Sequence, residues 1–217
     1  YGDSSMSNLN FLHSGGNKVT LSAPTNNPST NPVFKLPQTD GSAGQVLQTD
    51  GNGNLSFVNP PTNTPAFFAY WNANNSMTIS DSTDTKATWL TAEEFDTDNA
   101  YNTSTQTFTV PSGKGGYYTF NAGVQLYSNG NSLRTVIIRL RKNGSSSWAA
   151  SNYSQVMNSD ENRMRHHQAH LHAVVNLAAG DTIELICWGR VLNNSLYISN
   201  DASGVKSNFL SGYKLIL

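Results

Sequence analysis

Charged residues are scarce in this chain of 217 residues, at 12%, and the mean hydropathy is also low, at −0.43. Uncharged Asn, Ser, Thr, Gly and Gln therefore carry most of the polarity. This balance is typical of β-rich secreted or virion proteins. It is unlike helical cytosolic enzymes, which depend on strong helix formers such as Glu, Lys, Ala and Leu. The net charge of −1 gives no electrostatic footprint for nucleic acid.

The chain contains one cysteine, so it cannot close a disulfide within itself. Cys187 lies in the apolar pattern TIELICW, which predicts a small buried hydrophobic residue. No run of about 18 apolar residues occurs, and we expect no membrane insertion. No charged and then apolar leader follows Tyr1, so no secretory signal peptide is expected.

Sequence signatures of catalysis are missing as well. There is no Gly-x-Ser-x-Gly, no His-Glu-x-x-His and no glycine loop for phosphate. Glu93 and Glu94 are adjacent, which does not suggest the opposed carboxylates of a glycosidase. The sequence predicts a protein that is not an enzyme and that requires no particular cofactor.

Two regions of different composition divide the chain, and we predict an extended, β-poor stalk over 1–62 and a globular head over 63–217. The first region holds six of the eight prolines and five short apolar bursts, at 8–12, 18–23, 33–37, 44–49 and 54–58. Each burst is too short to form a core, so this region is stable only against sister copies or another partner. A disordered linker is the alternative.

The second region shows short alternating segments separated by turn formers, the pattern of an all-β sandwich. A short helical turn is conceivable at 91–94. Tight turns are expected at Asn143-Gly144 and at 179–181. The predicted strands are 66–70, 77–80, 105–110, 116–127, 134–142, 165–177, 181–188, 194–199 and 208–217.

Two predicted strands have one apolar and one polar side. In 116–126, Tyr118, Phe120 and Val124 alternate with polar residues, and in 165–177, Ala169 and Leu171 do the same. A period of two means that each strand packs one side on the core. The polar side then faces either water or a neighbouring subunit.

The order of five segments resembles the complement C-one-q globular head, a relative of the tumour necrosis factor jelly roll. The segments are Phe95-Asp96, FTVPSGKGGYYTFNAGVQL (108–126), VIIRLRKNG (136–144), VVNLAAGDTIEL (174–185) and FLSGYKLIL (209–217). The resemblance implies a ten-stranded, two-sheet jelly roll that forms a tight homotrimer. It also implies a three-fold interface that contains Thr119, Asn121, Gln125, Gln168, His170 and His172.

The first region resembles a segment that recurs in bacteriophage tail-fibre and appendage proteins, where it precedes variable receptor-binding heads. The matching pieces are KVTLSAP (18–24), FKLP (34–37) and GSAGQVLQTDGNGNLSF (41–57). The resemblance implies an extracellular virion fibre that attaches to other virion proteins through 1–62 and binds a host glycan or protein through its head. No Gly-X-Y stalk precedes the head, unlike in the complement family.

Other functions remain open at this stage. Within the virion, the chain could be a capsid-decorating fibre, or a tail or baseplate joint whose head binds another virion protein. From other classes, it could be a glycan-depolymerising tailspike or a secreted cellular lectin. A carboxylate pair in a groove would favour the tailspike.

Three sets of residues are candidate sites, each with a plainer structural interpretation. His170 and His172 would form rings around a three-fold axis and could hold a transition metal, or simply fill the interface. Asp96 and Asp98 offer oxygen ligands to calcium, although turn capping is the common role of such residues. Exposed aromatic residues and a cation could contact a glycan, or could be packing residues; these are Trp71, Trp148, Tyr153 and Arg190.

Overall fold

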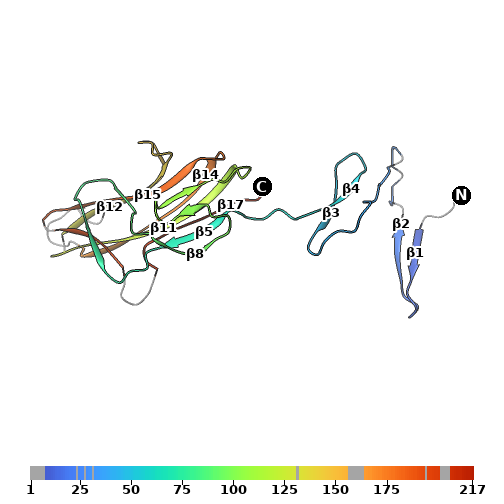
Figure 1. The fold of residues 1–217 in the computed structure, drawn as a ribbon, viewed down its shortest axis with the longest axis horizontal. Coiled ribbons are helices and arrows are strands. Elements are labelled where there is room, and N and C mark those ends of the chain that lie inside the picture. Colours follow the sequence, from blue (N-terminus) through green and yellow to red (C-terminus); the bar gives the residue numbers. More distant parts are fainter. Residues whose placement is uncertain are drawn as a thin grey trace. The chain divides into compact units, whose positions relative to one another are not determined.

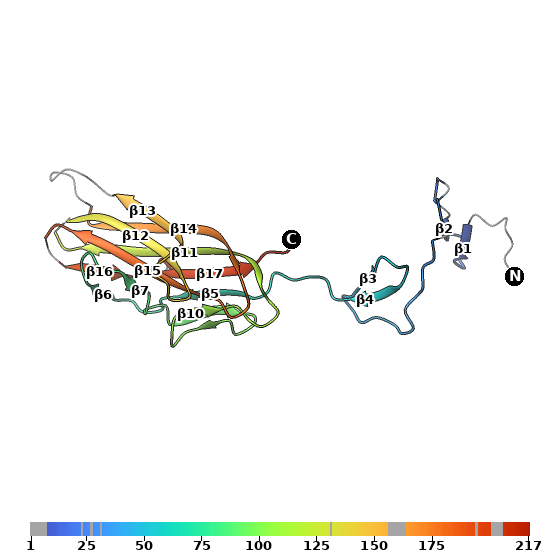
Figure 2. The same cartoon turned by 90° about the horizontal axis from the view of Figure 1, so that it is seen from above.

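The computed structural model describes residues 8–217 apart from 23, 27, 31, 131, 156–163, 194 and 201–205. The chain divides into two compact units, 1–61 and 62–217. The described residues form strands and turns, and they contain no helix long and apolar enough to cross a membrane. Figures 1 and 2 show the strands of both units.

The N-terminal unit contains two antiparallel hairpins within its described residues. One pairs β1 (Asn8–Leu12) with β2 (Lys18–Ser22), and the other pairs β3 (Val46–Thr49) with β4 (Leu55–Val58). Four of the five apolar bursts are therefore paired strands, which corrects the prediction of a β-poor segment. The fifth burst contributes a single parallel bridge from Lys35 to Asn54.

The head is an all-β sandwich of two sheets, and its described residues form thirteen strands, where the resemblance implied ten. The first sheet has the order β13-β12-β15-β10-β9, and β7 also pairs with β15. Its strands are β7 (Thr85–Lys86), β9 (Tyr101–Asn102), β10 (Thr107–Thr109), β12 (Leu133–Lys142), β13 (Trp148–Gln155) and β15 (Thr182–Val191).

The second sheet has the order β6-β16-β11-β17-β5-β8, and β14 also pairs with β11. Its strands are β5 (Ala66–Tyr70), β6 (Ser76–Ile79), β8 (Ala92–Asp96), β11 (Gly116–Ser128), β14 (His166–Leu177), β16 (Leu196–Ser199) and β17 (Phe209–Lys214). The short helical turn that the sequence allowed at 91–94 does not form. That segment begins β8, where Phe95 lies opposite Phe68 of β5.

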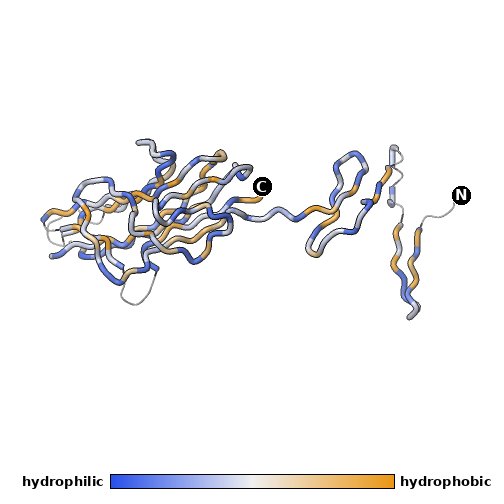
Figure 3. The backbone as a smooth tube through the Cα atoms, viewed as in Figure 1, coloured by the Kyte–Doolittle hydropathy of each residue, from blue (hydrophilic) through white to orange (hydrophobic). Residues whose placement is uncertain are grey.

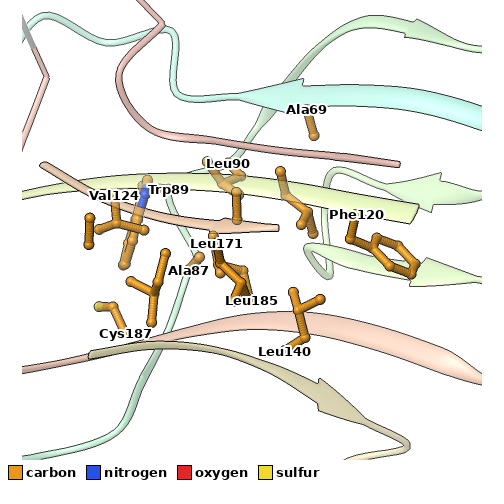
Figure 4. Packing of buried hydrophobic residues seen from close by; sticks show 14 of the residues in the cluster. Ala69, Ala87, Trp89, Leu90, Phe120, Val124, Leu140, Leu171, Leu185 and Cys187 are labelled. Atoms are coloured by element: carbon orange, nitrogen blue, oxygen red, sulfur yellow. The ribbon is translucent and has the colours of Figure 1, made fainter. Parts of the chain in front are cut away.

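Aromatic side chains join the two sheets at one end of the core. Phe108 of β10 lies 5.0 Å from Phe67 and 5.6 Å from Phe120, measured between ring centroids, and all three side chains are buried. Further along, aliphatic residues such as Val124 and Leu185 fill the space between the layers (Figure 4). Cys187 is fully buried in this core, which confirms its predicted packing role.

The first and last strands of the head are neighbours in the second sheet. β5 pairs with β17, and the amide of Lys214 donates to the carbonyl of Pro65 (3.0 Å). β11 begins beside this junction and runs for thirteen residues, which at about 3.3 Å per residue is roughly 40 Å. The end of β11 at Ser128 therefore lies at the end of the head far from the junction, which we call the distal end.

Candidate interaction face

The outer face of the second sheet is built by the alternation of β14 and β11. On β14, Ala169 and Leu171 point into the core, whereas His170 and His172 are exposed. The sequence predicted this division correctly, because a strand with one apolar side must place its other side outward. We refer to the outward positions of β14, β11 and β17 as the outer face.

The residues expected at a three-fold interface all lie on β11 and β14. The register of β11 and β14 places Asn121 opposite His172 and Gln125 opposite Gln168, so these four side chains form two cross-strand pairs on the same face. Thr119 differs from the others, since it is only 4% exposed. Its hydroxyl lies 3.2 Å from Nε2 of His172. Thr119 therefore orients that imidazole and contributes little exposed surface itself.

Exposed apolar side chains interrupt this polar face near the start of β11. Val174 is 55% exposed and Tyr213 is 40% exposed, and both lie opposite Thr119 in the register of their strands. Tyr117, in the same strand as Thr119, is 45% exposed. The sequence alternation placed Val174 on the outward side of its strand, where it is the one apolar residue in a polar series, whereas Tyr213 was not named as a surface residue.

Aromatic rings continue the outer face across β17 and β5. Phe209 stacks on Phe68 with ring centroids 5.5 Å apart, and the ring of His170 lies 6.4 Å from Phe209. The ammonium group of Lys206 lies 4.4 Å from the ring centroid of Tyr70 and forms an ion pair with Glu94. These rings give the face a flat and largely uncharged surface.

The outward positions of β14, β11 and β17 differ in charge from the outer side of the first sheet. The first sheet carries ion pairs from Glu184 to Lys86 and Arg141 (2.5 and 2.7 Å). Burial opposes the ionised form of Glu184, but hydrogen bonds from both cations hold the pKa of its carboxyl below the usual value. The outward positions of β14, β11 and β17 carry no Asp, Glu, Lys or Arg. Burying the second sheet's outer face against a protein therefore has the lower desolvation cost.

No group of three or more His, Cys, Asp or Glu side chains suited to a metal ion occurs among the described residues of a single chain. His170 and His172 provide two imidazoles on one exposed face. A metal site at these histidines would therefore need ligands from more than one copy. The donor chemistry fits a transition metal, because a neutral imidazole nitrogen is a common ligand.

The carboxylates of Asp96 and Asp98 are engaged within their own loop. Asp96 accepts hydrogen bonds from the amides of Tyr101 (2.8 Å) and Asp98 (3.3 Å). Asp98 accepts from the hydroxyl of Thr97 and lies 3.6 Å from the Lys114 ammonium. These contacts hold the loop as turn caps, so a calcium ion would have to compete with Lys114.

The candidate glycan residues are separated by the fold. Trp71 is only 7% exposed and packs near Trp89 in the core, so its predicted role as an exposed platform is wrong. Trp148, Tyr153 and Arg190 belong to the first sheet. Tyr153 is 59% exposed, whereas Trp148 lies under the guanidinium of Arg139 (4.6 Å).

A histidine beside the outer face makes the stability of the head sensitive to pH. Burial, and secondly the nearby His170, lower the pKa of His167 from 6.5. The unfolded chain therefore binds this proton more readily, and the free energy of unfolding falls as the pH decreases below about 6.5. We expect His167→Gln to lose less stability than the natural chain between pH 7.5 and 5.5, measured by urea unfolding. His13→Gln, in the N-terminal unit, is the control, and an equal pH dependence in all three proteins would contradict the expectation.

The head resembles solved structures in its fold, including the following two. The globular domain of a zebrafish complement 1qA protein is 14% identical, with a TM-score of 0.46, and the match covers 70% of this chain and 98% of that one. An Eiger tumour necrosis factor from S. frugiperda is 13% identical, with a TM-score of 0.48. This match covers 70% of the present chain and 92% of the Eiger chain. No protein-family model and no curated protein matches the sequence.

Proposed function

We propose that the chain is a non-enzymatic, homotrimeric fibre or appendage protein of a virus particle. Its N-terminal unit attaches to other virion proteins, and its head binds the host surface outside the cell. The observation that carries the proposal is the apolar side of the β1–β2 hairpin, which the described residues of its own unit leave uncovered.

This hairpin is strongly two-sided. Leu9, Phe11, Val19 and Leu21 share one side and are 52–68% exposed. Figure 3 shows hydrophobic stretches on both strands. An isolated two-stranded hairpin is at best marginally stable in water. Four large apolar residues on one side therefore favour a partner, and identical copies around a common axis offer the same side to one another.

The outer face of the head supports assembly in the same way. Its outward positions lack formal charge and contain Val174 and Tyr213. Interface centres are characteristically depleted in charge and enriched in aromatic residues. A trimer through this face also presents three heads to the same target, which strengthens weak individual contacts.

The virion assignment is supported by the resemblance of 41–57 to a segment of phage fibres. In the structure this segment folds as the hairpin of β3 and β4. The carboxylate of Asp50 caps its turn by accepting from the amides of Asn52 (2.8 Å) and Asn54 (3.1 Å). A defined turn is consistent with a recurring structural unit rather than a disordered linker.

Phe11→Asp should make the N-terminal unit of the full chain sensitive to protease. A carboxylate on the apolar side opposes packing against sister copies and so lowers the free energy of local opening. Limited proteolysis should therefore cut within 1–61 about tenfold faster or more. Asn10→Asp is the matched control, because it places the same charge on the polar side, where Asn10 accepts from Thr20 (2.6 Å). Equal cleavage of both variants would argue against a packed stalk.

The function is tested on cells and on particles. Labelled protein should bind the bacterium whose phage encodes the chain, and should compete with infection. Electron microscopy of intact particles separates a tail fibre from a capsid-decorating fibre or a baseplate joint. Protein that neither binds these cells nor occurs on particles would refute the proposal, and release of oligosaccharides from a surface glycan would indicate a tailspike.

An axial metal belongs to the same proposal. His170 and His172 of each copy would supply imidazole nitrogens, and a transition metal would strengthen the trimer by linking copies. Elemental analysis of the purified trimer should find about one transition-metal ion per trimer. Fewer than about 0.2 equivalents would remove this part of the proposal, and the same measurement reports on calcium at Asp96 and Asp98.

A further inference from the structure

A pocket of about 530 Å³ lies at the distal end of the head, where β6, β16, β11 and the start of β14 meet. This volume is within the range of about 300–1,000 Å³ that is typical of small-molecule sites. Unlike most such sites, the pocket has a polar lining, which consists of Asn75, Ser76, Gln125, Tyr127, Arg165, His166, Ser199 and Asn200.

Strand register builds one wall of the pocket from aromatic rings. Tyr127 of β11 pairs with His166 on one side and with Tyr197 on the other. The Tyr127 and His166 rings are stacked at 5.1 Å with an interplanar angle of 12°, and Tyr127 stacks on Tyr197 at 4.8 Å. The result is a row of three stacked rings, of which Tyr127 and His166 line the pocket.

Buried Asn208 fixes the strands beneath the pocket. Its side chain is fully buried, accepts from the amide of Gln125 (3.0 Å) and donates to the carbonyl of Ser199 (2.6 Å). Asn200 donates to the carbonyls of Trp71 and Ala73 (2.9 and 2.8 Å), which orders the opposite rim. The pocket is therefore held by satisfied hydrogen bonds before a ligand arrives.

Hydrogen-bonding capacity remains on the lining side chains. Asn75, Ser76 and Ser199 offer amide and hydroxyl groups that both donate and accept. Oε1 of Gln125 is buried and receives no hydrogen bond from the described residues. Buried polar atoms of native proteins normally find a partner. A ligand or an ordered water is therefore expected at this amide.

We propose that this pocket binds a sugar unit of a surface glycan, with a preference for a sugar that bears a carboxylate. Hydroxyl-rich ligands need groups that donate and accept, and the apolar side of a sugar ring packs on aromatic side chains such as Tyr127. Arg165 is exposed and carries the only formal charge among the described lining residues, so it favours an anionic sugar. A single cation is too few for nucleic acid, which is held by many phosphate contacts.

This inference rests on the proposed function and names the receptor class of the head. The pocket lies at the distal end, which is the end a fibre presents to its target. Gln125 belongs both to the pocket and to the proposed trimer interface, so the pocket borders that interface. A neighbouring copy could then add to one wall of the pocket.

The test uses the full-length chain on an array of neutral and carboxylated oligosaccharides, with affinities of the bound sugars then measured by titration calorimetry. We expect binding to carboxylated glycans. Tyr127→Ala should weaken all binding about tenfold or more, because it removes the ring platform. Arg165→Gln should weaken only carboxylated sugars by about tenfold or more, through loss of a charge-assisted hydrogen bond. Lys35→Gln removes an exposed cation of the N-terminal unit and should change nothing.

Several results would overturn the inference. These are a trimer that binds host cells but no oligosaccharide on the array, glycan binding that both pocket variants retain, and binding lost through Tyr153→Ala alone, which would place the site on the first sheet. Each leaves the fibre proposal intact. Failure to trimerise or to bind cells would instead count against the proposed function. Sedimentation and thermal unfolding of each variant confirm that it is assembled and folded.

Discussion

Val174→Glu is expected to convert the head, residues 62–217, from the proposed trimer into a folded monomer. The substitution places one carboxylate per copy on the outer face, at a position 55% exposed in the single chain. In a three-fold assembly, three carboxylates would then be removed from water near one another. The desolvation penalty of each is several kcal/mol, and no cation on the outward positions of β14, β11 or β17 compensates for it.

Analytical ultracentrifugation in dilute neutral buffer measures this change. Tyr153→Glu is the matched control, because Tyr153 has a similar exposure, 59%, on the outer side of the other sheet. The control should remain trimeric. A natural head that sediments as a stable monomer, or a Val174→Glu head that remains trimeric, would rule out the outer face as the interface.

Phe108→Ala is expected to lower the free energy of unfolding of the head by about 3–5 kcal/mol. Phe108 is fully buried, and its ring lies within 5.6 Å of the rings of Phe67, Tyr118 and Phe120. Removing it takes away aromatic contacts between the two sheets and leaves a cavity that rigid strands cannot close. Few single changes in this head should cost more.

Urea unfolding of a monomeric background, such as Val174→Glu, avoids the concentration dependence that assembly adds to stability. Phe95→Ala provides the control, because Phe95 is 48% exposed and its loss should cost about 1 kcal/mol or less. A loss below about 2 kcal/mol for Phe108→Ala would mean that the two sheets are not joined through this ring.

Strands with a clear period of two were predictable from the sequence. The predicted 116–127 and 165–177 differ by one residue at one end from β11 and β14, because each has an apolar side that only one register can bury. The positive φ angles of Asn143 and Gly144 were likewise expected, because an Asn-Gly pair favours tight turns of the primed type.

Short or non-alternating strands were not predictable in the same way. β8 contains Ala92, Glu93 and Glu94, whose local preference is helical, and it is a strand because β5 offers it an edge. β13 has no clear alternation of apolar and polar residues, and among the described residues it pairs only with β12. The pairing of Tyr127 with His166 and Tyr197, and hence the pocket, depends on three strands distant in sequence.

The pairing of β5 with β17 makes the head interchangeable as a cassette. Because its first and last strands are hydrogen-bonded neighbours, the head closes on itself, and its fold does not depend on contacts that 1–61 would have to supply. In the proposed fibre, one genetic crossover near Thr62 would therefore transfer a complete binding specificity onto another stalk. Recombination at this point would change the target of such a fibre while its proposed anchoring to the particle stays the same.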